Sequence, residues 1–403
     1  MGRLKNAWIY DGTRSPFGRN AGALASVRPD DLMVMTAQAL LSRHPQAREK
    51  IEDVYLGCAN QAGEDSRCIA RHVGLLAGLP IESAGVVFQR NCGSGLQAVI
   101  SAAHALEVGE AQALLVGGVE SMSRAPIVMS KAESAYSRDQ RIFDSALGAR
   151  FPNPQIEAQF GAHTMPETAD NLAVQFGLTR ERCDDFALRS QQRAARAQLS
   201  GRLAREISAI RLLPRRGNQV DVISDEHPRP ETTTQSLARL RPLFADGVTT
   251  AGNASGINDG AVALLMGSDS MGEMLGLKPM GRVIATATAG VEPRIMGYGP
   301  VPASQRALAR AGISLQDVEV IEINEAFAAQ VLACVEGLGL SESEDRLNPN
   351  GGAIALGHPL GASGPRLLLT ALHELELRNA RYALVTMCIG VGQGIAVVLE
   401  RAP

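Results

Sequence analysis

Aromatic residues are scarce in this chain, and their scarcity limits what it can bind. Phe, Trp and Tyr together make up 4% of the 403 residues, and only one is Trp. Stacking on single-stranded nucleic acid needs aromatic faces, and binding a duplex needs a strongly positive surface. The chain has 39 Lys and Arg residues against 42 Asp and Glu residues, a net charge of −3. We therefore expect no nucleic-acid partner.

Long apolar runs and targeting signals are also missing. No run approaches the roughly 18 apolar residues that a membrane helix needs. The basic N-terminus lacks the apolar segment of an export signal, and the final Arg401-Ala402-Pro403 is not a peroxisomal tripeptide. With 45% hydrophobic residues the composition is that of an ordinary globular protein. We expect a cytoplasmic protein with no membrane partner.

The cysteines lack the spacing of a structural framework. No C-x-x-C pair occurs, which disfavours both a zinc ribbon and a set of disulfides. A free cysteine is usually a small buried hydrophobic residue, so local sequence must identify any reactive one. The six are Cys58, Cys68, Cys92, Cys183, Cys334 and Cys388.

An internal repeat organises the chain. Residues 94–116 match residues 363–385 at an offset of 269, and residues 53–60 match residues 317–324 at an offset of 264. A relation of this length predicts two similar halves. Each half is expected to place an amphipathic helix (31–43; 303–311) before a β-rich run, an Asn-containing turn and a Gly-rich turn that opens a second helix.

Strands that alternate with helices predict parallel sheets and an α/β fold. The helix that begins at Ser94 is apolar or small nearly all round, so we expect it inside the protein. Central helices imply a five-layered α/β/α/β/α sandwich of two pseudo-symmetric halves.

An unrepeated segment separates the halves. Residues 121–250 are rich in Arg, Gln and Pro, with a polar helix expected around 180–200. We expect an inserted loop domain there, serving as a lid, an oligomerisation arm or a substrate platform. The two halves are then 1–120 plus 251–275, and 276–403.

Cys92 is the first chemical candidate. It follows a β-like run at 84–89 and precedes the buried helix. The start of a helix offers unpaired N–H groups and a positive dipole end, which lower the pKa of a thiol. The segment predicts a thiolate nucleophile; a buried cysteine at a turn is the alternative.

His358 lies in a Gly-dense segment, 348–364, that leads into the repeat partner of the Cys92 helix. Two facing halves would bring this histidine near Cys92, as a base beside a nucleophile. A histidine that serves only packing is the alternative.

Two further candidates follow strand-like runs. Gly390–Gly394 resembles a dinucleotide fingerprint, but it leads into another strand-like run at 395–399, which leaves Cys388 beside backbone rich in N–H donors. Asn324-Glu325 comes after a strand at 318–323, where open α/β sheets place their sites. A helix cap is the other reading of this pair.

Taken together, these segments resemble the thiolase family, of the degradative, acetyl-transferring kind. The resemblance extends from end to end. It rests on the Cys92 turn and on residues 117–123, 250–256, 324–327, 357–359 and 388–394. The family implies an acyltransferase that uses CoA to cleave a 3-oxoacyl-CoA into acetyl-CoA and a shortened acyl-CoA, by reversible Claisen chemistry.

The resemblance also implies a role for each catalytic residue. Cys92 would carry the acyl group, His358 would deprotonate Cys92 and later CoA, and Cys388 would protonate the departing acetyl-CoA carbanion. One oxyanion hole would consist of His358 and a water held by Asn324, and another of the N–H groups of Cys92 and Gly390. CoA is a co-substrate, and no metal or permanently bound cofactor is implied.

A mostly apolar CoA site is implied as well. The chain departs from many relatives at Thr164, where His is common, and at Pro166, where Gly is common. Positions that resemble family contacts are Met165, Arg229, Ser236, Ala251, Ser255, Met296 and Phe327.

Residues 58–65, 131–134 and 163–171 look most like the 3-oxoadipyl-CoA thiolases of aromatic-compound breakdown. That substrate ends in a carboxylate, which needs a cation or several donors in a desolvated pocket. Arg138, Arg141 and Arg150 are available, and we favour Arg150.

Other readings remain open. A general fatty 3-ketoacyl-CoA or acetoacetyl-CoA thiolase and a ketoacyl synthase are alternative enzymes. A non-catalytic CoA or lipid carrier is the alternative of another class. The family further implies a homo-oligomer, a dimer of dimers (homotetramer).

Overall fold

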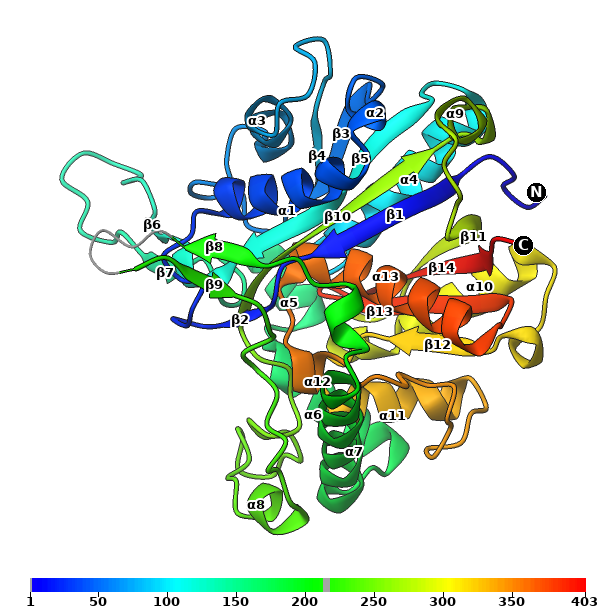
Figure 1. The fold of residues 1–403 in the computed structure, drawn as a ribbon. Coiled ribbons are helices and arrows are strands. Elements are labelled where there is room, and N and C mark those ends of the chain that lie inside the picture. The colour runs from blue at the N-terminus through cyan, green and yellow to red at the C-terminus, as the bar shows by residue number, and fades with distance from the viewer. Residues whose placement is uncertain (1, 213–217) are drawn as a thin grey trace.

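A mixed sheet runs through the computed structural model, which describes residues 2–212 and 218–403 (Figure 1). Within this part of the chain the strand order is β12-β13-β14-β11-β1-β10-β5-β3-β4, with β2 paired to β10. These strands are β1 (Trp8–Arg14), β2 (Gly18–Arg19), β3 (Asp53–Gly57), β4 (Val86–Phe88), β5 (Ala113–Ser121), β10 (Asn258–Gly267), β11 (Gly281–Gly290), β12 (Val320–Ile323), β13 (Tyr382–Ile389) and β14 (Gln393–Arg401).

The sheet divides into two halves with a short junction. Strands β1 and β11 connect them through only two residue pairs, Trp8 with Arg282 and Ile9 with Gly281. Strand β3 runs parallel to β4 and β5, and β12 runs parallel to β13, as predicted. The prediction of wholly parallel sheets is wrong for β1, β10, β11 and β14, which pair antiparallel. For example, β13 and β14 are separated by residues 390–392, which are too few for a crossover.

Two buried helices lie between the half-sheets. Helices α4 (Ser94–Val108) and α13 (Leu360–Arg378) pack against each other, and both contact strands of the two half-sheets. Leu96, Val99 and Leu106 of α4 have no exposed surface, which confirms the prediction for this helix. Helices α1 (Pro29–Arg43) and α3 (Ile69–Leu76) cover the first half-sheet, and α10 (Pro300–Ala311) and α11 (Ala328–Gly337) cover the second. The five-layered sandwich is therefore confirmed.

Glycine permits the two central helices to meet at their N-termini. A Cβ on Gly95 would lie 2.0 Å from the carbonyl oxygen of Gly361, at the start of the opposite helix. Because glycine has no side chain at this position, the two helix starts and the loops before them can converge. The elements of the repeat occupy matching places, since β3, α4 and β5 correspond to β12, α13 and β13.

The inserted segment spreads around the second half and to one side of the first (Figure 1). The polar helix expected at 180–200 is α7, and it contacts α11 and α12. The insert contains the hairpin β6 (Ile127–Met129) and β7 (Ile142–Asp144), α5 (Pro154–Phe160), α6 (Met165–Phe176), α7 (Arg180–Leu199), the hairpin β8 (Ile210–Leu212) and β9 (Val220–Val222), and α8 (Thr234–Ala238). The remaining helices are α2 (Pro45–Arg48), α9 (Asp269–Leu275) and α12 (Ala353–Leu356).

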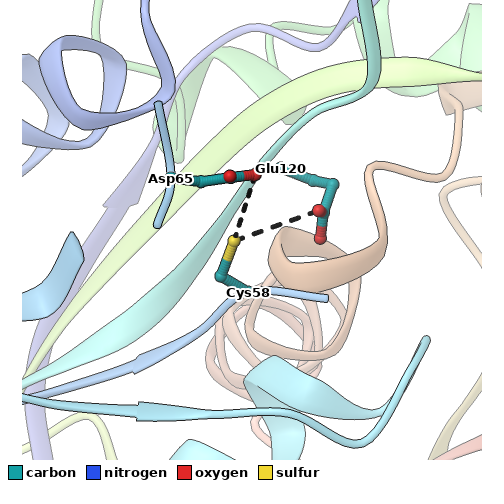
Figure 2. A group of neighbouring side chains, drawn as sticks. All are labelled: Cys58, Asp65 and Glu120. Atoms are coloured by element: carbon teal, nitrogen blue, oxygen red, sulfur yellow. Dashed lines mark hydrogen bonds between the residues drawn. The ribbon is translucent and has the colours of Figure 1, made fainter. Parts of the chain in front are cut away.

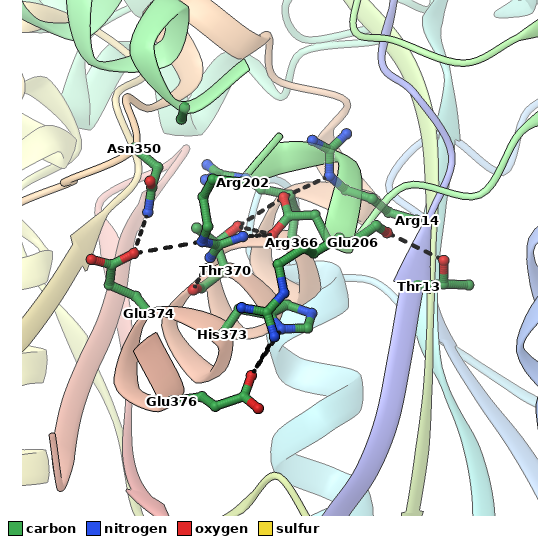
Figure 3. Close-up of polar contacts among 12 residues, drawn as sticks. Thr13, Arg14, Arg202, Glu206, Asn350, Arg366, Thr370, His373, Glu374 and Glu376 are labelled. Atoms are coloured by element: carbon green, nitrogen blue, oxygen red, sulfur yellow. Dashed lines mark hydrogen bonds and ion pairs between the residues drawn. The ribbon is translucent and has the colours of Figure 1, made fainter. Parts of the chain in front are cut away.

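A buried ionic network ties the insert to both halves (Figure 3). Arg14 of β1 binds Glu206 at 2.9 Å and Asp225 at 2.6 and 2.8 Å, both from the insert. Thr370 of α13 donates its hydroxyl to Glu206 at 3.1–3.2 Å, and Arg202 lies 3.3 Å from the same carboxylate. Among the described helices, none has both the length and the apolar character to cross a bilayer.

Candidate functional site

Cys92 lies in a tight turn at the start of α4. Asn91 adopts a left-handed conformation (φ 45°), and Ser94 Oγ accepts the Arg90 N–H at 2.9 Å and donates to the Asn91 carbonyl at 2.6 Å. These bonds fix the turn from both sides. A Cβ on Gly93 would lie 2.5 Å from Ile389 Cδ1, so a side chain at this position would displace the end of Ile389 in β13.

The Cys92 thiol is only partly exposed, and its surroundings favour the protonated form. Burial raises the pKa of the thiol to about 11, although the N–H groups of Gly390 and of Cys92 itself act to lower it. The dipole of α4 therefore does not outweigh desolvation in the empty site. The expectation of a thiolate at rest is not supported, and the thiol needs a base.

His358 is held in a defined orientation by the loop before α13. Gly357 has φ 100°, and the His358 N–H donates to Asn258 Oδ1 at 3.0 Å. His358 Nδ1 lies 2.6 Å from Ser363 Oγ, whose own proton goes to the Pro359 carbonyl at 2.9 Å. Because that hydroxyl must accept from Nδ1–H, the proton is on Nδ1 and the lone pair is on Nε2.

The lone pair of His358 Nε2 accepts a hydrogen bond from Asn324. Asn324 Nδ2 lies 3.3 Å from this atom and is its donor. Burial, followed by the charge of Arg366, lowers the pKa of His358 to about 4. The imidazole is therefore neutral at physiological pH and is able to act as a base.

Asn324 is fixed by its backbone and leaves one side-chain acceptor free. Its N–H donates to the Thr386 carbonyl at 3.0 Å, which ties the end of β12 to β13. Its Oδ1 is buried and has no partner among the described residues. A buried amide oxygen without a partner fits a water molecule or a substrate donor.

Cys388 is buried near the end of β13, close to Cys92. Burial, and then the charge of Cys92, raises the pKa of Cys388 well above its ordinary value. Gly390, two residues further on, presents its N–H to Cys92 and accepts Asn91 Nδ2 at 3.2 Å on its carbonyl.

The structure therefore gathers the five predicted catalytic residues around the starts of α4 and α13 and the ends of β12 and β13. The described residues include no direct hydrogen bond between Cys92 and His358.

The predicted CoA contacts occupy varied environments. Met165 Sδ lies 3.6 Å from where a Cβ on Gly390 would be, so it borders the catalytic residues. Met296 and Phe327 are buried in the second core, and Ser255 donates its N–H to the Ala326 carbonyl at 2.9 Å. Arg229, Ser236 and Ala251 are exposed. The role of these seven residues stays a prediction.

Ser363, Asn258 and Glu120 are the residues that sequence reasoning missed. Ser363 sets the tautomer of His358, and Asn258 holds its backbone. Glu120 accepts the N–H groups of Ala59 and Asn60, each at 3.0 Å, and that of Gly361 at 2.9 Å. Two sequence features could have identified Ser363 and Glu120. Ser363 lies five positions after His358, and Glu120 is a carboxylate at the end of an otherwise apolar strand.

A buried cluster of Cys58, Asp65 and Glu120 has the residue types of a metal site (Figure 2). The Cys58 sulfur lies 3.9 Å from Asp65 Oδ2 and 4.0 Å from Glu120 Oε1. Both oxygens of Glu120 already accept backbone N–H groups, and burial together with the two carboxylates keeps the pKa of Cys58 high. A metal ligand must be deprotonated and free, so the donor set fits a metal poorly. The cluster instead anchors the loop after β3.

A two-half α/β sandwich with a cysteine and a histidine at facing helix starts has the nucleophile and the base of an acyl-transfer enzyme. Family models describe the same class: the thiolase N-terminal domain matches residues 7–270, and the thiolase C-terminal domain matches residues 277–401. The chain belongs to the thiolase family and is an acyltransferase.

The chain also matches individual relatives and solved structures over nearly its full length. The chain is 57% identical to the 3-oxoadipyl-CoA/3-oxo-5,6-dehydrosuberyl-CoA thiolase of Escherichia coli, over 99% of this chain and 100% of that protein. It is 52% identical to a beta-ketoadipyl-CoA thiolase of Acinetobacter baylyi, with the same coverage. Among solved structures, human mitochondrial 3-ketoacyl-CoA thiolase in complex with CoA matches with a TM-score of 0.90 at 38% identity, covering 100% of this chain and 99% of that one.

Proposed function

We propose that this enzyme cleaves 3-oxoadipyl-CoA with CoA, giving acetyl-CoA and succinyl-CoA through an acyl group on Cys92. The observation that carries the proposal is the grouping of a thiol, a neutral imidazole with its lone pair on Nε2, and a second buried thiol. Each of the three has a separate task in the reaction, and a carrier that only binds CoA would need none of them.

In the first half-reaction His358 Nε2 takes the Cys92 proton as the sulfur attacks the keto carbon. The bond between the second and third carbons of the acyl chain then breaks, and its electron pair leaves as the acetyl-CoA carbanion. Cys388 gives its proton to that carbon. The high pKa of the buried Cys388 thiol keeps the proton on the sulfur until the carbanion forms.

In the second half-reaction CoA takes the acyl group from Cys92. Before CoA reacts, the proton that His358 took from Cys92 passes to the Cys388 thiolate, so both groups return to their starting states. His358 then deprotonates the CoA thiol, whose sulfur attacks the thioester carbonyl and breaks its bond to the Cys92 sulfur. Succinyl-CoA leaves, and the Cys92 thiolate takes the proton back from His358. Negative charge develops on an oxygen in both steps. The N–H groups of Cys92 and Gly390 would stabilise one such oxygen, and His358 with a water on Asn324 Oδ1 would stabilise the other, each removed donor costing about 3–4 kcal/mol of the barrier.

The CoA arm would run past Met165, Ser255, Met296 and Phe327 toward the exposed Arg229. Ser236 and Ala251, which are also exposed, would contact the outer part of CoA. CoA enters as a co-substrate and leaves as a product. No resident metal or cofactor takes part in the proposed steps, because thiols, imidazole and backbone N–H groups supply every proton and every charge contact.

The substrate preference can be tested with two substrates of equal chain length and with acetoacetyl-CoA as a third. We expect the purified enzyme to form acetyl-CoA from 3-oxoadipyl-CoA with at least about 10-fold higher kcat/KM than from 3-oxohexanoyl-CoA, since one charge-assisted hydrogen bond contributes about 1.5–3 kcal/mol. Equal kcat/KM values for the two six-carbon substrates would favour a general fatty 3-ketoacyl-CoA thiolase. A preference for acetoacetyl-CoA would favour an acetoacetyl-CoA thiolase. No turnover of any of the three would favour a CoA or lipid carrier.

The proposal extends to assembly and location. The insert carries exposed apolar side chains on and near the β6–β7 hairpin, which suit a contact with another copy of the chain. They include Ile127, Met129, Tyr136, Ile142 and Phe151. We assign the enzyme to a cytoplasmic dimer of dimers, in line with the closed symmetry of most homo-oligomers.

A further inference from the structure

Arg150 differs from Arg138 and Arg141, the two other cations predicted for the substrate carboxylate, in that hydrogen bonds hold its guanidinium group in place. It is half-buried, whereas Arg138 and Arg141 are exposed. Arg124, at the other end of this segment, is paired with Glu64 at 2.5 and 2.6 Å. Within residues 2–212 and 218–403, no carboxylate lies within ion-pair distance of Arg150.

Asn60 holds the guanidinium group in place. Arg150 Nη1 donates to Asn60 Oδ1 at 3.1 Å, and Nη2 donates to the Asn60 carbonyl. Asn60 Nδ2 in turn donates to the Ser145 carbonyl and hydroxyl at 3.1 and 3.2 Å. The segment that carries Arg150 is thus folded over the loop that follows β3.

That loop borders the catalytic residues. The Cys58 N–H donates to Phe88 at the end of β4, just before the Cys92 turn, at 3.2 Å. The N–H of Asn60 donates to Glu120, which also accepts from Gly361 at the start of α13. Glu120 is near enough to Cys92 to contribute to its raised pKa. Arg150 is therefore connected to the surroundings of Cys92 through Asn60 and Glu120.

The guanidinium keeps donors available for a ligand. Two of its nitrogens each use one proton on Asn60, and none of its atoms is both buried and unpartnered. The guanidinium of Arg150 can therefore bind an anion without first breaking its hydrogen bonds to Asn60. The planar, two-pronged donor arrangement of an arginine suits a carboxylate. In a 3-oxoadipyl chain the terminal carboxylate is three carbon–carbon bonds from the keto carbon, about 4 Å, so its cation must lie at the edge of the catalytic shell.

We propose that Arg150, held by Asn60, is the residue that selects a substrate whose acyl chain ends in a carboxylate. This inference rests on the proposed function and assigns its substrate preference to one side chain. Arg150 touches the distal end of the acyl chain and takes no part in proton transfer or in carbon–carbon bond cleavage.

The experiment measures kcat/KM for 3-oxoadipyl-CoA and 3-oxohexanoyl-CoA in the wild type and in Arg150→Gln, Arg150→Lys and the control Arg141→Gln. Arg150→Gln should lose at least 10-fold on 3-oxoadipyl-CoA, mainly through KM, and stay within twofold of wild type on 3-oxohexanoyl-CoA. Arg150→Lys should keep part of the preference because it keeps the charge. Arg141→Gln should match the wild type on both.

Four outcomes distinguish the proposed substrate from the role assigned to Arg150. Equal wild-type values for the two substrates would overturn the proposed substrate itself and the role of Arg150 with it. A wild-type preference that survives in Arg150→Gln would overturn the arginine assignment alone. An equal loss on both substrates in Arg150→Gln and Arg150→Lys would mean that Arg150 only supports Asn60. A preference that weakens as salt rises from 0.05 to about 0.5 M, and is absent in Arg150→Gln, would support a charge contact.

Discussion

At the scale of single residues, two cysteines of one site have different tasks because their surroundings differ. Cys92 is partly exposed, beside N–H groups that can receive negative charge, whereas Cys388 is buried in β13. Burial keeps a proton on both sulfurs at rest. The accessible thiol is suited to attack, and the enclosed thiol is suited to give its proton to a carbanion.

The first prediction separates these tasks. Cys92→Ala should form no acyl-enzyme, whereas Cys388→Ala should still be acylated slowly by an acyl-CoA but should neither make nor break the carbon–carbon bond. Intact-protein mass spectrometry detects the adduct, and acetyl-CoA release reports bond cleavage. Cys68→Ala, in a cysteine outside the site, is the control and should behave as wild type. An acyl adduct on Cys92→Ala at the wild-type level would refute the assignment.

The second prediction concerns the pH dependence of the thiol and imidazole pair. Between the pKa of His358, about 4, and that of Cys92, about 11, the number of protons on the pair is constant. The rate of Cys92 alkylation by iodoacetamide should therefore be nearly flat from pH 6 to 9. His358→Ala should lower it by about 100-fold or more at pH 7, because general base assistance is lost.

In His358→Ala the remaining reaction should rise about 10-fold per pH unit, since only the free thiolate reacts. Peptide mapping confirms that Cys92 is the alkylated residue. A flat profile in His358→Ala, or an unchanged rate at pH 7, would show that His358 is not the base.

At the scale of elements, buried charges fasten the insert to the sandwich. Arg14 comes from β1, Glu206 and Asp225 come from the insert, and Thr370 comes from α13. Burial raises the pKa of Glu206, but Arg14 and Arg202 outweigh burial and lower it to about 2. A carboxyl group with a lowered pKa contributes stability above its unfolded pKa of about 4.3, and this contribution is lost as the pH falls toward 2.

The third prediction removes the central cation of that network. Arg14→Met should lower the free energy of unfolding by about 3–5 kcal/mol at pH 7, because Asp225 is left buried without a cation and Glu206 keeps only Arg202 as its cation. Urea unfolding at fixed protein concentration measures the change. Arg19→Met, which breaks an exposed pair with Glu226, is the control and should cost less than about 1 kcal/mol. Equal losses of unfolding free energy in Arg14→Met and Arg19→Met would show that the buried ion pairs of Arg14 contribute no more than an exposed pair.

At the scale of the whole molecule, an exposed apolar hairpin remains to be covered. The β6–β7 hairpin exposes 64% of Ile127 and 68% of Ile142, and Ile142 is paired with Met129, which is itself 64% exposed. Exposed apolar side chains grouped in this way are typical of a contact surface. The hairpin protrudes to one side of the sandwich (Figure 1), where another copy of the chain could reach it.

The fourth prediction tests this assembly. Light scattering at micromolar concentration should give the mass of four chains for the wild type. Ile127→Asp combined with Ile142→Asp should reduce the particle to two chains, because charges on the hairpin oppose its burial. Ser134→Asp, between the two strands of the hairpin, is the control and should leave four chains. A single-chain wild-type mass would disprove the dimer of dimers.

Sequence patterns determined much of this protein because they are local or repeated. The repeat at offsets of 269 and 264 predicted two halves, and the nearly continuous apolar surface of residues 94–108 placed α4 in the centre. The Cys92 and His358 segments were found for the same reason, since glycines and helix starts are visible in a short window. The antiparallel strands were missed because strand direction depends on where the chain returns, which periodicity does not reveal.

Only the tertiary structure decided the state and orientation of the site. The high pKa of Cys92 comes from burial, which opposes the helix-start effect that the sequence suggested. Which nitrogen of His358 is the base follows from Ser363 and Asn324, and the second of these lies 34 residues away in the chain. Arg150 meets Asn60 across 90 residues. Contacts between distant segments depend on how whole layers pack, so no local pattern specifies them.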